Sequence, residues 1–586
     1  MSRRLWIVVA LAGLLVIAAG WLAARGMQAM RLRSGAEVDV TRLKQDLRAG
    51  HFTAAGADLR RLHRDARTAR AVTRDPLVRV AGVLPVIGPD IRAARIAAQA
   101  SYDVLEAAEP MEIALPRLGA SLSSPSGAYI DVAAVRQAAE AIPAVNAAVH
   151  TGAELLAGVD PQRLHYGLGD GVGRLRERLV AGGTSLDSVE DSATVWPSMA
   201  GADGPRTYVL LLQQDAEARG TGGIVGSYAV LRMDRGRLTL LRTASREKTL
   251  DPGPPIPTTS LPTDIWDLWG TDLAEWAGLN LSPHFPWTGQ LVAAGWQARQ
   301  ESPRLDYVAA VDQDVFAALL AGTGPVKVGP MTVSRDNAAA FLSRDVYARY
   351  SPAQVDEITG QLVSTTVGRL TGGRIDLPAV AQAMAEPIKE HRLLIWAADA
   401  KEQEKLESLP LSGALPDSPG PTTTVVVNNG AGGKLDAYLS VHTLYDPGTC
   451  TDGVLESHDV VTVQNTAPAH GLPDYVTLRA DLSEEGITHH VPGSNRTIVD
   501  IYGPVGAEQA LTTVDGEAVD VIEGMDREHP VWRLFLELQP GQKRTIDVMF
   551  LDSVSATIPG ETPQVILQPM AVPATAQTKP LPRCGA

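Results

Sequence analysis

The stretch YVLLLQQDAEARGTGGIVGSYAVL, residues 208–231, decides how the middle of the chain folds. Its first seven residues, Tyr208–Gln214, form an apolar run that is typical of a buried strand. Ser227–Met233 and Arg237–Thr243 have the same character and lie at hairpin distance around the turn sequence Asp234-Arg235-Gly236. We therefore predict a sheet here, with polar residues and glycines between its first two strands.

The residues between these two strands combine charge with backbone freedom. Asp215, Glu217 and Arg219 come first, and glycines follow at positions 220, 222, 223 and 226. Glycines allow backbone amides to converge on an anion, carboxylates bind divalent cations, and an arginine pairs with a phosphate through two hydrogen bonds. A tight turn between two strands is the commoner role of such a stretch, so both interpretations stay open.

Strands and helices alternate beyond this hairpin. Tyr307–Asp312 reads as a strand and Gln313–Ala321 as a helix, and helical patterns return at Ser334–Tyr350 and Pro352–Leu370. This alternation predicts a mixed α/β domain over residues 200–412.

Five tryptophans are concentrated between the hairpin and the strand at Tyr307. They are Trp266, Trp269, Trp276, Trp287 and Trp296. Their aromatic faces would either stack on sugar rings or pack in the core, and core packing is the favoured alternative.

An uncharged apolar stretch of 20 residues lies near the start of the chain, at residues 5–24. At about 1.5 Å of rise per residue, such a helix spans a bilayer core of about 30 Å. Its length and the lack of a small-residue cleavage site favour an uncleaved anchor over a signal peptide. We therefore expect a single-pass plasma-membrane protein anchored by residues 1–34, with its N-terminus in the cytoplasm and its bulk outside.

Residues 35–195 are rich in Ala, Leu and Arg, and their apolar residues recur every three or four positions. This period predicts a membrane-proximal helical stalk. Arginines at positions 60, 64, 67, 70 and 74 share one helix face. That face would contact lipid or a polyanion, or it would be a solvated charged face, which is the favoured alternative.

Charge is distributed unevenly along the chain. The first hundred residues hold 17 Lys and Arg against 7 Asp and Glu, whereas the whole chain has a net charge of -15. Because the acidic remainder would repel phosphates, we exclude nucleic acid as the main partner.

The C-terminal third changes to short β-rich runs separated by turn residues, one of them at Tyr475–Leu482. This pattern predicts an antiparallel β-sandwich over residues 421–556, followed by a Pro/Thr-rich tail at residues 557–586. The two cysteines, Cys450 and Cys584, would form a disulfide in an oxidising compartment, and two unpaired buried thiols are the alternative.

Several common catalytic signatures are missing from the sequence. It contains no Gly-Lys-Ser/Thr of a phosphate-binding loop, no Gly-x-Ser-x-Gly of a serine hydrolase and no His-Glu-x-x-His of a zinc protease. Any chemistry must therefore come from a less familiar arrangement.

The hairpin sequence resembles the actinobacterial domain-of-unknown-function 4012 family. The resemblance rests on its Tyr-x-Leu-Leu-Leu-Gln strand, Glu-x-Arg, Thr-Gly-Gly and Gly-Ser-Tyr, and on further segments in the same order. These are LPVIGPDIRAAR at 84–95, SPHFPWTGQ at 282–290, VDQDVFAALLAGTGPVKV at 311–328, DNAAAFLSRDVYARY at 336–350 and NTAPAHGLPDYV at 465–476. The resemblance implies an anchored envelope protein and supplies no established activity.

A remoter similarity is to the LytR-CpsA-Psr phosphotransferases, which move glycopolymers from polyprenyl pyrophosphate to the cell wall. It implies catalytic roles for Asp215, Arg219 and Arg246, with Asp215 holding Mg²⁺. It also implies a ligand contact at Arg344. The residues of the turn themselves suggest further ligand contacts at Glu217, Gly222 and Gly223. The chain departs from those enzymes where Gly222-Gly223 replaces a second aspartate and where Gly360-Gln361 stands in place of an Arg-Gln pair.

Together these patterns predict a multidomain α+β protein. It consists of an N-terminal transmembrane helix, a helical stalk, a mixed α/β LytR-CpsA-Psr-like domain and a C-terminal antiparallel β-sandwich. Two functions remain open. One is binding, or transfer as a LytR-CpsA-Psr-like phosphotransferase, of a pyrophosphate-linked or other anionic glycan such as a polyprenyl-linked cell-wall precursor. The other is a noncatalytic extracytoplasmic scaffold or interaction protein for envelope assembly.

Overall fold

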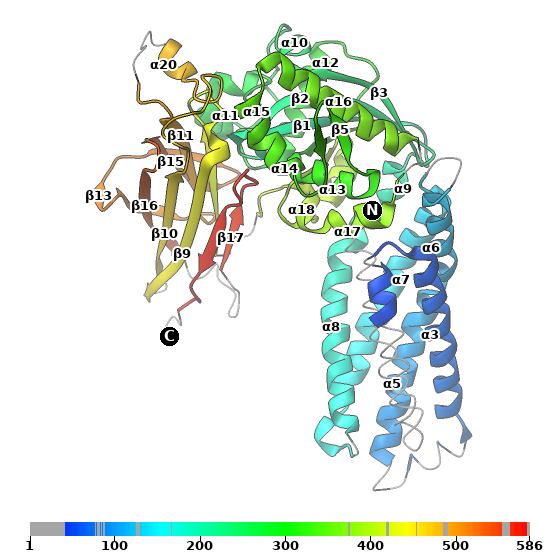
Figure 1. Ribbon diagram of the computed structural model, residues 1–586. Helices are drawn as coiled ribbons and strands as arrows, with labels where there is room; N and C mark the ends of the chain where they lie inside the picture. The colour runs from blue at the N-terminus through cyan, green and yellow to red at the C-terminus, as the bar shows by residue number, and fades with distance from the viewer. Residues whose placement is uncertain are drawn as a thin grey trace.

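The computed structural model describes residues 41–582, apart from 48, 77, 79–81, 84, 86–87, 125–128, 166, 373–374, 418–420, 453, 485–489 and 554–562. These residues form a mixed α/β, multidomain structure with several sheets. A helix bundle extends from a central α/β core, and a β-sandwich lies against the same core on another side (Figure 1).

The predicted fold class is wrong in its first element. No helix of the described residues is both long enough and apolar enough to cross a membrane. The long helices α7 (Val132–Ala157) and α8 (Leu168–Ala193) carry charged residues such as Arg136 and Glu177 among their apolar ones. The expected span at residues 5–24 lies outside the described residues.

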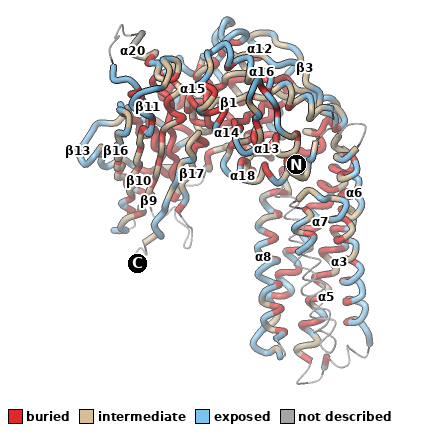
Figure 2. The backbone as a smooth tube through the Cα atoms, in the orientation of Figure 1, coloured by how far each residue is buried: buried red, intermediate tan, exposed pale blue. Residues whose placement is uncertain are grey.

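The bundle is built from amphipathic helices whose small apolar side chains face inward. Besides α7 and α8 it contains α3 (Phe52–Thr73), α5 (Gly88–Ala107) and α6 (Glu109–Leu122). Buried Ala, Leu and Val residues from all five helices form one hydrophobic cluster. The exposed residues lie on the outer side (Figure 2). Alanines let the helix axes approach closely, and the leucines between them fill the remaining space of this core.

The arginine face of α3 turns partly toward its neighbours in the bundle. Arg60 donates to the backbone carbonyl of Glu112 at 2.7 Å, and Arg74 donates to Gln99 Oε1 at 2.8 Å. The guanidinium of Arg70 lies 3.9 Å from the centre of the Tyr102 ring. These arginines therefore make contacts between helices, and binding of lipid by this face stays a prediction.

The α/β core is built on a five-stranded sheet with the order β3-β2-β1-β4-β7. The strands are β1 (Arg206–Arg219), β2 (Gly222–Asp234), β3 (Arg237–Ser245), β4 (Tyr307–Val311) and β7 (Leu393–Ala397). Only β1 and β4 pair in parallel, and the other neighbours are antiparallel. A small ribbon of β5 (Val326–Val328) and β6 (Met331–Val333) lies apart from this sheet.

Helices surround this sheet. They are α9 (Trp196–Met199), α10 (Arg246–Thr249), α11 (Thr263–Trp269), α12 (Phe285–Ala298), α13 (Gln313–Thr323), α14 (Ala338–Ala340), α15 (Val346–Arg349), α16 (Pro352–Thr371), α17 (Leu377–Ala383), α18 (Ala385–Lys389) and α19 (Ala400–Glu407). Trp269, Trp276 and Trp296 are buried in one cluster with Val209 and Leu211 of β1. These three tryptophans therefore pack in the core, whereas Trp266 is 37% exposed.

The sandwich consists of two facing sheets, with the orders β13-β12-β16-β10-β9-β18 and β14-β15-β11-β8-β17. Its strands are β8 (Thr422–Asn429), β9 (Leu439–Thr451), β10 (Val454–Asn465), β11 (Asn495–Tyr502), β12 (Glu508–Val514), β13 (Glu517–Ala518), β14 (Ile522–Asp526), β15 (His529–Leu538), β16 (Lys543–Ser553), β17 (Gln564–Leu567) and β18 (Thr575–Thr578). Alternating apolar residues of both sheets meet in a shared core, as in other sandwiches.

Two features of this region differ from the sequence analysis. Tyr475–Leu482 is not a strand, because most of it is irregular and α20 (Ala480–Glu484) begins within it. Within the Pro/Thr-rich tail, β17 pairs in parallel with β8 and β18 pairs in parallel with β9. The tail therefore completes both sheets, and the sandwich is not wholly antiparallel.

The core and the sandwich share a buried interface. Val426, Tyr502 and Val531 of the sandwich belong to the same hydrophobic cluster as the tryptophans of the core. Nearby, Arg533 of β15 forms an ion pair with Asp500 of β11 at 2.6 Å. The two parts therefore behave as one packed unit, unlike domains joined only by a linker.

Arg533 also reaches into the α/β core. Its guanidinium donates to the carbonyl oxygen of Leu268 at 2.7 Å and lies 3.5 Å from the centre of the Trp269 ring. Asp500 is fully buried, so without Arg533 its charge would have no compensating partner.

We expect Arg533→Ala to lower the free energy of unfolding by about 3 to 5 kcal/mol, because it strands a buried carboxylate. Urea titration of the purified variant measures this change. Lys389→Ala serves as the control, because Lys389 pairs with Glu386 on the surface and its loss should cost under about 1 kcal/mol. The double change Arg533→Met with Asp500→Leu should recover most of the lost stability, because it removes both charges. If Arg533→Ala is as stable as the wild type, Arg533 does not compensate a buried Asp500 charge at this interface.

Candidate functional site

The glycine-containing turn joins β1 and β2 into one long hairpin. The sequence analysis ended the first strand at Gln214, but β1 continues to Arg219. The pairing passes from Gln214 opposite Ile224 to Ala218 opposite Gly223, so residues 215–217 form a bulge. A bulge redirects side chains that would otherwise alternate regularly, and it separates the charged residues of this segment.

The glycines are explained by close backbone approach. A Cβ atom on Gly223 would lie 2.2 Å from the carbonyl carbon of Gln214. A Cβ atom on Gly220 would lie 2.3 Å from the carbonyl oxygen of Leu281. Gly222 has a φ of 131°, a conformation that strongly favours glycine. These contacts account for the glycine pattern by packing, and ligand binding by Gly222 and Gly223 stays a prediction.

Asp215 is buried beneath the hairpin, with 2% of its surface exposed. Burial, together with the neighbouring Asp312 carboxylate, raises the pKa of Asp215 to about 7. Arg392 acts in the opposite direction, because its positive charge favours the ionised carboxylate. Asp215 therefore lies in an acidic environment that contains an arginine the sequence analysis did not single out.

Arg392 is the centre of this environment. Its guanidinium contacts Asp312 at 2.6 Å, Asp314 at 2.8 Å and Glu390 at 2.7 Å. Only 3% of Arg392 is exposed, and Asp312 also accepts hydrogen bonds from the first amides of α13. Nothing local in the sequence marks Arg392, because its partners come from a distant segment and from the turn before β7.

Arg219 occupies a different environment from Asp215. Its guanidinium donates to the carbonyl oxygens of Ala277 at 3.2 Å, Ala218 at 2.9 Å and Asn429 at 3.4 Å. Burial lowers the pKa of Arg219, while the nearby carboxylates of Glu217 and Asp436 act against that change.

Asp436, which the sequence analysis did not single out, is fully buried next to this arginine. It accepts hydrogen bonds from the amide of Ala218 at 2.9 Å, from Asn429 at 2.6 Å and from Asn495 at 2.7 Å. Burial raises the pKa of Asp436 to about 6. Three segments of the sandwich region thus hold the end of β1.

The other predicted ligand residues also have partners within the protein. Arg246 donates to the carbonyl oxygen of Val225 at 2.6 Å and forms an ion pair with Asp251. Glu217 forms an ion pair with Lys434, whose ammonium lies 4.9 Å from the centre of the Tyr347 ring.

Arg344 is the most accessible of the predicted ligand residues, with 44% of its side chain exposed. Its Nε atom lies 3.8 Å from the carboxylate oxygen Oδ1 of Asp345. The charges of Glu217 and Arg246 both influence the pKa of Arg219. Asp215 lies in the separate environment around Arg392.

The C-terminal tail covers the hairpin. The side chain of Gln568 donates to the carbonyl oxygen of Arg219 and accepts from the amide of Val427 at 2.6 Å. Two residues later, the carbonyl oxygen of Met570 accepts from Arg392 at 3.0 Å. Residues 568–570 therefore bridge both charged environments.

Two further predictions concern the metal and the disulfide. Within the part of the chain that the structure describes, no group of three or more His, Cys, Asp or Glu side chains is arranged to hold a metal ion. Magnesium binding at Asp215 stays a prediction. Cys450 is disulfide-bonded, and the other cysteine of the chain, Cys584, lies outside the described residues.

The raised pKa of Asp215 has a consequence for stability. The folded chain keeps the Asp215 proton to a higher pH than the unfolded chain does. The contribution of Asp215 to the free energy of unfolding therefore falls as the pH rises from about 4 to about 7. Asp215→Asn removes this contribution, so the variant should gain stability relative to the wild type, on the order of a few kcal/mol, as the pH rises through that window.

Urea titrations near pH 4, 6 and 8 measure the difference between variant and wild type. Asp267→Asn makes the same chemical change at an exposed aspartate of α11 and is the matched control. A constant difference for Asp215→Asn would show that this carboxyl group does not titrate in the window.

No curated protein and no solved structure matches this chain. The comparisons therefore give no support to a relationship with the LytR-CpsA-Psr enzymes or to an actinobacterial origin. Residues 203–347, which contain the hairpin, Arg246 and Arg344, match the family model described as "Protein of unknown function (DUF4012)".

Proposed function

We propose that this protein is a noncatalytic scaffold that acts by binding partners of an assembly and carries out no turnover of its own. The observation that supports this most directly is the engagement of its two candidate catalytic arginines, Arg219 and Arg246, by other parts of the chain. Arg219 donates to three backbone carbonyls, and the tail residue Gln568 covers the same turn.

A phosphate clamp requires arginine N–H groups that point toward an open site. The Arg246 guanidinium is already bound to Val225 and Asp251, and only 12% of its side chain is exposed. A pyrophosphate could reach it only by displacing these partners. This arrangement favours a structural role for the arginines over electrostatic stabilisation of phosphoryl transfer.

The overall architecture also suits a scaffold. The core and the sandwich are joined through Arg533 and the shared tryptophan cluster, and the helix bundle extends away from them (Figure 1). A bonded cysteine at position 450 favours an oxidising compartment, because disulfides persist there. The protein would therefore act as a rigid platform, in which the length of the helix bundle sets how far the core and the sandwich lie from the far end of the bundle.

The test compares turnover and binding directly. The purified full-length protein is incubated with Mg²⁺ and a synthetic polyprenyl-pyrophosphate-linked sugar, and products are followed by mass spectrometry. We expect no product above the protein-free reaction and no heat of binding for inorganic pyrophosphate.

The variants Arg246→Gln and Lys389→Gln form a matched pair, because Lys389 lies on the surface, forms an ion pair with Glu386 and is not one of the candidate site residues. Both should behave as the wild type in these assays and when they replace it in cells. Transfer by the wild type that falls at least tenfold in Arg246→Gln alone would overturn the scaffold proposal in favour of a phosphotransferase.

A further inference from the structure

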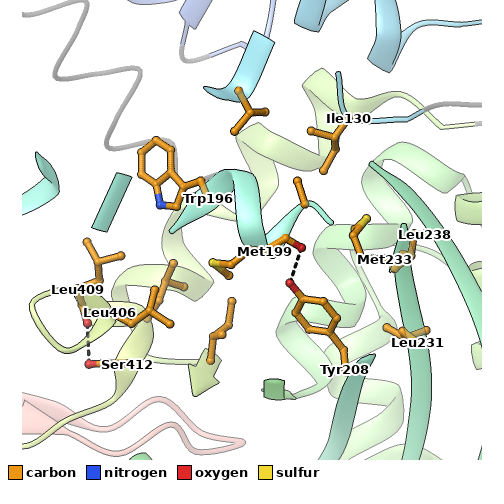
Figure 3. Close-up of a pocket in the computed structure, with 14 residues that line it drawn as sticks. Ile130, Trp196, Met199, Tyr208, Leu231, Met233, Leu238, Leu406, Leu409 and Ser412 are labelled. Atoms are coloured by element: carbon orange, nitrogen blue, oxygen red, sulfur yellow. Dashed lines mark hydrogen bonds between the residues drawn. The ribbon is translucent and has the colours of Figure 1, made fainter. Parts of the chain in front are cut away.

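A pocket of about 210 Å³ lies where the helix bundle meets the α/β core (Figure 3). Its walls come from three parts of the chain. The end of the bundle contributes Ile130, Val135, Trp196, Met199 and Ala200. The sheet contributes Tyr208, Leu231, Met233, Leu238 and Ile395, and the segment after β7 contributes Leu406, Leu409, Leu411 and Ser412.

The two hydroxyl groups of the lining are already hydrogen-bonded. The Tyr208 hydroxyl donates to the carbonyl oxygen of Met199 at 2.6 Å. The Ser412 hydroxyl donates to the carbonyl oxygen of Leu409 at 2.8 Å. Figure 3 shows both bonds, with the remaining labelled side chains presenting hydrocarbon, sulfur or the indole ring of Trp196. The lining therefore offers few free hydrogen-bonding groups to a guest.

A water molecule in a buried site needs two to four polar partners, and an apolar cavity of about 150 Å³ stays dry and accepts a benzene-sized guest. The present pocket is larger, and most of its lining is apolar. Charged and strongly polar ligands are disfavoured, because they would lose their hydration without gaining hydrogen bonds. The chemistry of the lining thus selects a guest made of hydrocarbon.

We propose that this pocket binds a single hydrocarbon chain, straight or isoprenoid, with any polar end left outside. The partly exposed lining residues Leu231, Leu238 and Ile395 leave it accessible to a chain end. The two methionines, Met199 and Met233, have unbranched side chains that adapt to guests of different shape. A bound chain would contact the bundle and the core at once.

The fixed frame around the pocket keeps it from collapsing. The amide of Ile130 donates to the carbonyl oxygen of Gly236 at 2.8 Å. The amide of Gly236 in turn donates to the carbonyl oxygen of Ala200 at 2.7 Å. On the opposite side, Ser198 donates to Glu402 at 2.6 Å and Lys405 donates to Thr194 at 2.8 Å. These bonds hold the bundle and the core at a set separation, so the apolar space between them persists.

Titration of the full-length protein with decanol and with farnesol tests the proposal. Isothermal calorimetry should show saturable binding of at least one of them, and the thermal unfolding midpoint should rise with its concentration. A preference for decanol would indicate an acyl-type chain, and a preference for farnesol would indicate an isoprenoid.

Two variants on β3 make the test specific. Leu238→Trp fills the pocket from a lining position, whereas Leu241→Trp adds the same side chain at a residue that is 43% exposed and outside the lining. Affinity should fall at least tenfold in Leu238→Trp and stay unchanged in Leu241→Trp.

Circular dichroism and the unfolding midpoint without ligand establish that both variants are folded. If Leu238→Trp does not fold, Met233→Trp replaces it, because Met233 lines the same wall. Binding of neither alcohol by the wild type, or equal binding by wild type and folded pocket variants, would overturn the proposal.

Discussion

The pairing of buried charge beneath the β1–β2 hairpin is the constraint on which the arrangement of the core and the sandwich depends. Arg392 is almost fully buried, and a buried ion without partners costs several kcal/mol. Its partners Asp312 and Asp314 begin α13, Glu390 precedes β7, and the carbonyl oxygen of Met570 lies in the C-terminal tail. The arginine is satisfied only when all these segments are in place, so this part of the fold must form as a unit.

The same constraint explains why the hairpin looks like a ligand site in the sequence. A phosphate clamp and an intramolecular clamp use the same groups, namely arginines, carboxylates and glycines that allow close approach. Here the carbonyl oxygens of Ala277 and Asn429 take the place that a phosphate would have at Arg219, and Gln568 closes the turn from outside. The difference lies in partners more than 50 residues away, which the local pattern does not contain.

Features that depend on neighbouring residues could be predicted from the sequence, whereas features that depend on distant segments could not. The strand at Tyr307 and the helix after it depend on periodicity and on the Asp312 cap, both of which are local signals. The run Tyr475–Leu482 has the composition of a strand but is mostly irregular, and the two neighbours of β8 in its sheet are β11 and β17. The Pro/Thr-rich composition of the tail does not indicate a strand, yet β17 pairs with β8 through contacts that composition does not reveal. Arg392 likewise has no local signal, because most of its partners lie far from it in the sequence.

Rigid joining also explains how an apolar space can survive between the bundle and the core. Side chains normally close a void, because empty volume forfeits dispersion contacts. At this junction a backbone bond from Ile130 to Gly236 links the walls on one side, and a side-chain bond from Ser198 to Glu402 links them on the other. Gly236 lies so close to Ile130 that a Cβ atom would be 1.8 Å from the Ile130 carbonyl oxygen, which leaves no room for the walls to approach further at this point. These links at the edges of the pocket set the spacing of its walls, so the apolar side chains between them do not close the space.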